Sequence, residues 1–197
     1  MTGIIFENEV NFEYDIRGLL TAFYPGEPVS VGTEEGCDRC LRFLYEPERI
    51  SITLKNADGR QRSEQVWVAY EDRKAAKSAL KRLLYDILSL DTGKKLPWGT
   101  LTGIRPVKLP MAMLEQGKTE EEIHRFMAGE YYVSPEKTDL SIRIARRERE
   151  ILREIDYEQG YSLYVGIPFC PSICLYCSFS SSPIAQWENR VEEYLDA

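Results

Sequence analysis

Three of the five cysteines in this chain, Cys170, Cys174 and Cys177, fall within eight residues. Their C-x3-C-x2-C spacing suits an iron-sulfur cluster, because one short loop can supply three thiolates to a four-iron, four-sulfur cube. Ordinary ferredoxin motifs space their cysteines differently and add a fourth thiolate, whereas Ser178 and Phe179 follow Cys177 here. The spacing therefore implies a cluster with one iron left open to chelate a small molecule.

Two other interpretations of the three cysteines are less favoured. Cysteines are often buried, but three of them close together after an apolar run and Pro168 would be an unusual way to build a core. Zinc ribbons use paired spacings that C-x3-C-x2-C lacks. The sequence favours an iron-sulfur cluster over buried thiols, disulfides or zinc.

The residues around the cysteines resemble the radical S-adenosylmethionine superfamily. Residues 164–177 read YVGIPFCPSICLYC and residues 177–179 read CSF, which narrows the resemblance to the coproporphyrinogen III dehydrogenase-like branch, in its HemZ type. The run WGTLTGIRPVKL at 98–109 resembles a segment found upstream of the cluster in that group. By this resemblance, the chain is identified as the N-terminal portion of such an enzyme.

The resemblance implies two cofactors, a [4Fe-4S] cluster and S-adenosyl-L-methionine. Cys170, Cys174 and Cys177 would each hold one iron, and the open iron would take the amino and carboxylate groups of S-adenosyl-L-methionine. Tyr164 and Tyr176 match aromatic positions that contact this cofactor in the family, although either is also explained as a core aromatic. No residue is assigned a catalytic role.

The resemblance also implies a substrate and a reaction. In this family an electron from the reduced cluster cleaves S-adenosyl-L-methionine, and the resulting radical abstracts hydrogen from coproporphyrinogen III, whose propionates become the vinyl groups of protoporphyrinogen IX in haem biosynthesis. An electron donor of unknown identity is required. Gly166 stands where many relatives have histidine, and Phe179 where the dehydrogenases often have a further cysteine. The alternative is therefore a haem chaperone-like protein that binds haem without decarboxylation.

Composition excludes several other classes. The 43% hydrophobic and 29% charged residues are those of a globular protein. A net charge of -7 argues against nucleic acid as a partner. No apolar stretch is long enough for a membrane span, and the acidic N-terminus does not resemble a secretory signal. An odd number of cysteines, three of them clustered, fits a reducing compartment, so a cytoplasmic location is expected.

Residues 1–92 are expected to form an α+β domain, in which two helices cover a small antiparallel sheet. Apolar residues recur at helical spacing in two segments and alternate in three others. The predicted helices are 12–23 and 72–90, and the predicted strands are 42–45, 50–54 and 66–70.

Residues 93–159 are expected to form a connector and a small helical domain. Thr119 begins a capping box, and Ser134 precedes Pro135 as an N-cap. In the Gly- and Pro-rich connector, Arg105 and Lys108 are interpreted as parts of a packed linker in preference to contacts with a substrate carboxylate.

The last helix of this segment is rich in arginine, which invites a nucleic-acid interpretation. Its acidic residues balance these charges, and Arg146 is predicted to pair with Glu150 at i,i+4 spacing. We therefore expect a solvated charged face. The stripe predicted to face the core is Leu140, Ile144, Ile151 and Ile155.

Residues 160–197 are expected to begin a TIM-like radical S-adenosylmethionine barrel. The segment 162–167 is predicted as a buried strand leading into the cysteine loop, and 182–197 as the following helix. This arrangement would place the cluster at the carboxyl end of the first barrel strand, where such barrels carry their chemistry. One strand cannot close a barrel, so the chain alone is expected to be inactive.

A second cysteine pair, Cys37 and Cys40, has C-x2-C spacing and is a candidate for metal binding or redox work. The chain has no second such pair, and its one histidine, His124, lies far along the sequence. A structural role for Cys37 and Cys40 is therefore the favoured interpretation.

Overall fold

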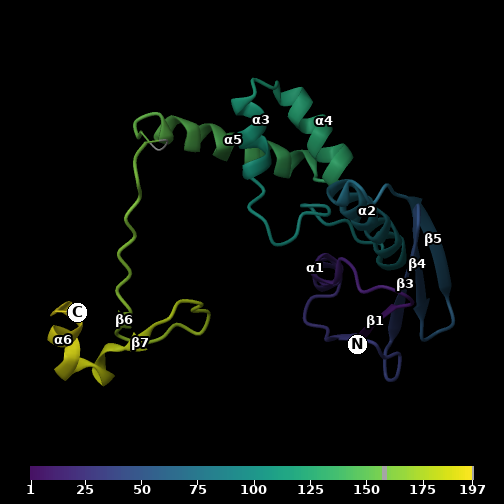
Figure 1. The fold of residues 1–197 in the computed structure, drawn as a ribbon, viewed down its shortest axis with the longest axis horizontal. Coiled ribbons are helices and arrows are strands. Elements are labelled where there is room, and N and C mark those ends of the chain that lie inside the picture. Colours follow the sequence, from purple (N-terminus) through teal and green to yellow (C-terminus); the bar gives the residue numbers. More distant parts are fainter. Residues whose placement is uncertain (157–158, 197) are drawn as a thin grey trace. The chain divides into compact units, whose positions relative to one another are not determined.

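The computed structural model describes residues 1–156 and 159–196, which fall into two units (Figure 1). The first unit is Met1–Glu154 and the second begins at Ile155. The predicted segments 93–159 and 160–197 include residues 157, 158 and 197, which lie outside the described residues.

A five-stranded mixed sheet forms the centre of the first unit, with strand order β2-β1-β3-β4-β5. Strand β1 runs parallel to both of its neighbours, whereas β3, β4 and β5 are antiparallel to one another. The strands are β1 (Thr2–Phe6), β2 (Val29–Val31), β3 (Arg39–Glu46), β4 (Arg49–Asn56) and β5 (Gln61–Trp67).

The three strands predicted as an antiparallel sheet correspond to β3, β4 and β5, which are antiparallel. The sheet as a whole is mixed, because β1 and β2 add parallel pairs that the prediction did not include. Helix α1 (Glu13–Phe23) carries the chain from β1 to β2, and such a crossover returns the chain in the same direction. The α+β class itself is confirmed. Strand β2 has only three residues, too few to show an alternating pattern.

Two helices cover one face of the sheet, α1 and α2 (Arg73–Thr92), close to the predicted ranges (Figure 1). Alternate residues of β3 and β4 point to this face, which makes their apolar side chains one side of the core. The fully buried core includes Leu41, Phe43, Ile50 and Ile52 from the sheet, Ile16, Leu19, Leu20 and Phe23 from α1, and Leu80, Leu84, Ile87 and Leu88 from α2.

The third predicted strand, 66–70, is shifted. The observed strand β5 begins at Gln61 and ends at Trp67. Most of its side chains are exposed because β5 is the edge of the sheet. Residues 61–65 are polar, so a prediction from apolar alternation does not detect them.

A second hydrophobic cluster lies among α3 (Lys108–Glu115), α4 (Glu120–Tyr131) and α5 (Pro135–Leu152), which confirms the predicted helical character of this segment. Thr119 and Glu122 form the predicted capping box, and the Ser134 side chain caps α5 with Pro135 in its first turn. The buried centre is Ile123, Met127, Val133 and Ile142.

The connector packs between the two clusters. Trp98 and Leu101 join the second cluster, and the Ser134 amide donates to the Pro97 carbonyl at 2.9 Å. Residues on both sides of residue 92 belong to the same compact unit, and a domain boundary at that position stays a prediction.

The apolar stripe predicted for α5 is wrong. Ile144, Ile151 and Ile155 are exposed. The helix instead buries Ile142 with three small residues, Thr138, Ser141 and Ala145, because small side chains let α5 pack closely against its neighbours.

The second unit contains short elements only. The predicted strand 162–167 is irregular and exposed, because a parallel strand needs partner strands and the described residues provide none for it. The predicted helix 182–197 is broken. The elements are β6 (Phe169–Cys170), β7 (Ser182–Pro183), two 3₁₀ turns at Ile184–Gln186 and Glu188–Arg190, and α6 (Val191–Asp196).

Within the described residues, no helix combines the length and the apolar character needed to cross a membrane.

Candidate metal centre

The cysteine loop is closed at its base by β6 and β7, which pair in parallel (Figure 1). The Ser182 amide of β7 donates a hydrogen bond at 2.8 Å to the carbonyl of Pro168, the residue before β6. Cys170 belongs to β6, and Cys174 and Cys177 lie in the loop that follows. The two short strands therefore hold the ends of the loop that carries all three thiols.

Aromatic contacts fix the base of the loop. The Phe169 ring lies 5.0 Å from the Tyr194 ring in an edge-on arrangement and 5.8 Å from the Trp187 ring. The Tyr194 hydroxyl donates to the Gly166 carbonyl at 3.3 Å. The α6 segment thus supports the strand from which the cysteine loop starts.

The three cysteines are free thiols. Cys174 is exposed, and Cys170 and Cys177 are partly buried. The Cys177 amide donates to the Cys174 carbonyl at 2.9 Å, which forms a turn between the last two cysteines. A hydrogen bond with the Ser181 hydroxyl, at 3.5 Å, lowers the pKa of the Cys177 thiol.

The donor set fits an iron-sulfur cluster chemically, since three unpaired thiols on one accessible loop are the ligands that such clusters use. Among the described residues, however, no three cysteine, histidine or acidic side chains lie close enough together to hold a metal ion. The loop would therefore have to draw its thiols together on binding, as metal sites that form only with their metal do.

Tyr164 and Tyr176 are 83% and 89% exposed. Neither ring therefore packs in a core within the second unit, and the alternative of core aromatics is not tested by this structure. No hydrogen bond joins either side chain to another described residue. The predicted contact of both tyrosines with S-adenosyl-L-methionine stays a prediction.

The connector motif divides into a packed part and an exposed part. The Thr100 amide donates to the Tyr131 carbonyl at 2.7 Å, and the Thr102 hydroxyl accepts from the largely buried Lys81 ammonium at 3.0 Å. Arg105 is exposed and lies 3.4 Å from the Glu148 carboxylate. The first part of the motif is therefore packed, as predicted for the connector, whereas Arg105 and Lys108 are exposed and do not bear out the prediction of packing.

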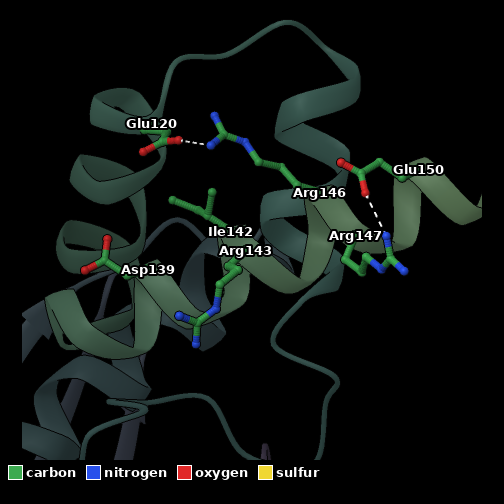
Figure 2. Close-up of a pocket in the computed structure, with 7 residues that line it drawn as sticks. All are labelled: Glu120, Asp139, Ile142, Arg143, Arg146, Arg147 and Glu150. Carbon is green, nitrogen blue, oxygen red and sulfur yellow. Dashed lines mark hydrogen bonds and ion pairs between the residues drawn. The ribbon is translucent and has the colours of Figure 1, made fainter.

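A pocket of about 490 Å³ lies on the face that α5 presents beside α4, and Figure 2 shows the residues that line it. Arg146 pairs with Glu120 of α4, so the predicted pair between Arg146 and Glu150 is wrong, and Arg147 instead pairs with Glu150 at 3.1 Å. The charges offset one another across the pocket. Its lining is Glu120, Asp139, Ile142, Arg143, Arg146, Arg147 and Glu150.

Residues that the sequence did not single out surround Cys37 and Cys40. The Cys40 sulfur donates to Glu34 Oε1 at 3.6 Å, and the Cys37 sulfur lies 3.5 Å from the Ser30 hydroxyl. Ser181 beside Cys177 was likewise missed. Glu34 and Ser181 could have been suggested by their closeness in sequence to Cys40 and Cys177. Ser30 could not, because the pairing of β2 with β1 brings it to Cys37.

Comparison with known proteins supports the sequence interpretation. The chain is similar to the oxygen-independent coproporphyrinogen-III oxidase-like protein HemZ of Bacillus subtilis (strain 168), with 33% identity over 189 residues. No protein-family model matches the chain, and no solved structure is significantly similar. The match covers 91% of this chain, which spans 38% of the length of HemZ. This similarity confirms the resemblance to HemZ-type, coproporphyrinogen-III oxidase-like proteins that the two motifs predict.

Proposed function

We propose that this chain is the N-terminal part of a radical S-adenosylmethionine oxidoreductase that converts coproporphyrinogen III to protoporphyrinogen IX. The observation that carries the proposal is the loop of three free thiols, Cys170, Cys174 and Cys177. The similarity to HemZ, a protein named as coproporphyrinogen-III oxidase-like, supports the choice of substrate.

In this proposal, Cys170, Cys174 and Cys177 hold three irons of a [4Fe-4S] cluster and leave the fourth to S-adenosyl-L-methionine. When bound, the cluster would supply the electron that cleaves S-adenosyl-L-methionine. The residues of this chain would bind the cluster and orient S-adenosyl-L-methionine. The hydrogen bond between Ser181 and Cys177 favours the thiolate that iron requires.

Tyr164 and Tyr176 are the proposed cofactor contacts. Both side chains are exposed and have no hydrogen-bonded partner among the described residues. Their rings therefore have surface available for stacking on an adenine, an interaction that suits aromatic side chains.

Residues 162–167 are proposed to become the first strand of a TIM-like barrel when neighbouring strands are present. The segment reads SLYVGI and exposes Leu163, Val165 and Ile167. An apolar run of this kind is typical of strands buried within a parallel sheet. The barrel would place Cys170 at the carboxyl end of that strand.

The experiment is anaerobic reconstitution of the whole protein that contains this chain, followed by assay with S-adenosyl-L-methionine and coproporphyrinogen III. We expect methionine, carbon dioxide and protoporphyrinogen IX from the natural sequence, and none of them from Cys174→Ser. Cys37→Ser is the matched control and should keep the activity. A cluster that binds without decarboxylation, together with stoichiometric haem binding, would replace this proposal by the haem-chaperone alternative.

A further inference from the structure

The two N-terminal cysteines meet at Gly3 of β1, Cys40 by strand pairing and Cys37 from a loop. Gly3 of β1 pairs with Cys40 of β3, so both residues project to the same face of the sheet. A Cβ atom on Gly3 would lie 2.9 Å from the Cys37 sulfur. The Cys37 sulfur therefore occupies the space of the missing side chain, beside Cys40 on a strand about 4.8 Å away.

The two thiols differ in access. Cys37 is partly exposed, whereas Cys40 is 6% exposed. Burial, together with the nearby Glu34 carboxylate, raises the pKa of the Cys40 thiol to about 11. Cys37 is therefore the more accessible of the two thiols to a reagent in solution.

The segment that carries Cys37 is a loop held by a few hydrogen bonds, among them that of the Cys37 amide with the Glu34 carbonyl at 3.2 Å. Residues 32–38 contain neither helix nor strand. Gly32 and Gly36 have φ angles of 82° and 72°, which glycine adopts without steric cost. These two glycines give the loop the backbone freedom that a bond between Cys37 and Cys40 would require.

We propose that Cys37 and Cys40 form a thiol–disulfide exchange site, oxidised by a small-molecule disulfide such as oxidised glutathione. This site is separate from the Cys170–Cys177 loop. It gives the C-x2-C pair a chemical role in addition to packing.

The exchange proceeds in two balanced steps. The Cys37 thiolate attacks one sulfur of the disulfide, forms a mixed disulfide and releases one small thiol, which takes up the proton that Cys37 lost. The Cys40 sulfur then attacks the Cys37 sulfur. Its proton passes to the Glu34 carboxylate, 3.6 Å away, and on to the second departing thiol. Two protein thiols are oxidised by two electrons, and one disulfide is reduced to two thiols.

Trypsin offers a direct assay, because Arg39 lies between the two cysteines. Cleavage gives one peptide from Gly18 to Arg39 that carries Cys37 and a second, Cys40–Arg42, that carries Cys40. The cysteines 170, 174 and 177 all fall in the separate peptide 154–190. A bond between Cys37 and Cys40 therefore joins two short peptides and cannot be confused with oxidation of the other loop.

The whole chain is equilibrated anaerobically with reduced and oxidised glutathione at a series of ratios, alkylated under denaturing conditions, digested and analysed by mass spectrometry. We expect the linked pair, two hydrogens lighter than the separate peptides, to accumulate as oxidised glutathione increases. Cys37 and Cys40 should both become unavailable for alkylation at the same glutathione ratios.

Two variants sharpen the test. Cys40→Ser should stop at a glutathione adduct on Cys37, and Cys37→Ser should leave Cys40 alkylatable at every ratio. The proposal is overturned if the natural chain shows only the Cys37 adduct, or if both thiols remain alkylatable in the most oxidising buffer. Circular dichroism of each variant confirms that the loss of linkage does not reflect unfolding.

Discussion

Gly99 lies directly against the carbonyl group of Tyr131. A Cβ atom at Gly99 would overlap the Tyr131 oxygen and the Tyr132 carbonyl, and the φ angle of Gly99 is 55°. The next residue, Thr100, donates its amide to the same Tyr131 oxygen at 2.7 Å. This contact joins the connector to the carboxyl end of α4 and explains the glycine in the WGTLTG motif.

Gly99→Ala is therefore expected to lower the free energy of unfolding by at least about 2 kcal/mol, because it combines a left-handed backbone with a direct overlap. Urea denaturation followed by circular dichroism measures the change. Gly129→Ala is the matched control. Gly129 lies in α4, where an added methyl group would meet no atom within 4 Å, and alanine there should raise stability by about 0.5–1 kcal/mol. Equal effects of the two substitutions would contradict this packing role for Gly99.

The amino end of α4 predicts a pH dependence. The Thr119 amide and the Lys118 ammonium both bind the Glu122 carboxylate and hold its pKa below the ordinary value of 4.5. A depressed carboxyl pKa stabilises the fold above the unfolded value, and this contribution is lost as the pH falls through the folded value. We expect the stability difference between the natural chain and Glu122→Gln to shrink below pH 4.5.

The measurement is urea denaturation of both proteins from pH 7 to pH 3. Thr119→Ala provides the control, since it removes the cap at every pH and should cost about 1 kcal/mol. Parallel stability curves for the natural chain and Glu122→Gln would show that the carboxylate contributes no pH-dependent stability.

The α5 face predicts a specific ion pair. Because Arg146 pairs with Glu120 and Arg147 pairs with Glu150, a double-mutant cycle of Arg146→Ala with Glu120→Ala should give a coupling of about 0.2–1 kcal/mol at low salt. The cycle of Arg146→Ala with Glu150→Ala should give none. A larger coupling energy in the second cycle would show that Arg146 pairs with Glu150, as the i,i+4 spacing suggests.

Local sequence patterns predicted the helices whose apolar stripes and end residues are visible within the helix itself. Helices α1 and α2 were expected over 12–23 and 72–90 and are found at Glu13–Phe23 and Arg73–Thr92. Their apolar stripes are continuous, and Asp72 and Gly93 mark the ends of α2. The caps of α4 and α5 were predictable for the same reason, since each depends on residues three positions apart.

Features that depend on distant partners could not be predicted. Strand β2 is defined by its pairing with β1 and not by its own short sequence. The buried stripe of α5 consists of small residues, which no hydrophobic pattern marks. The predicted strand 162–167 lacks its neighbours. The cysteine spacing predicts the cluster ligands, but only the structure shows Ser181 beside Cys177.

The central claim is that Cys170, Cys174 and Cys177 hold an iron-sulfur cluster. The most direct test is iron and sulfide analysis, with electron paramagnetic resonance, after anaerobic reconstitution of the chain and its serine variants. We predict about four irons per chain for the natural sequence and for Cys37→Ser and Cys40→Ser. Serine at position 170, 174 or 177 should abolish the reduced-cluster signal. Iron retained in all three of these variants, or lost in Cys37→Ser, would contradict the assignment.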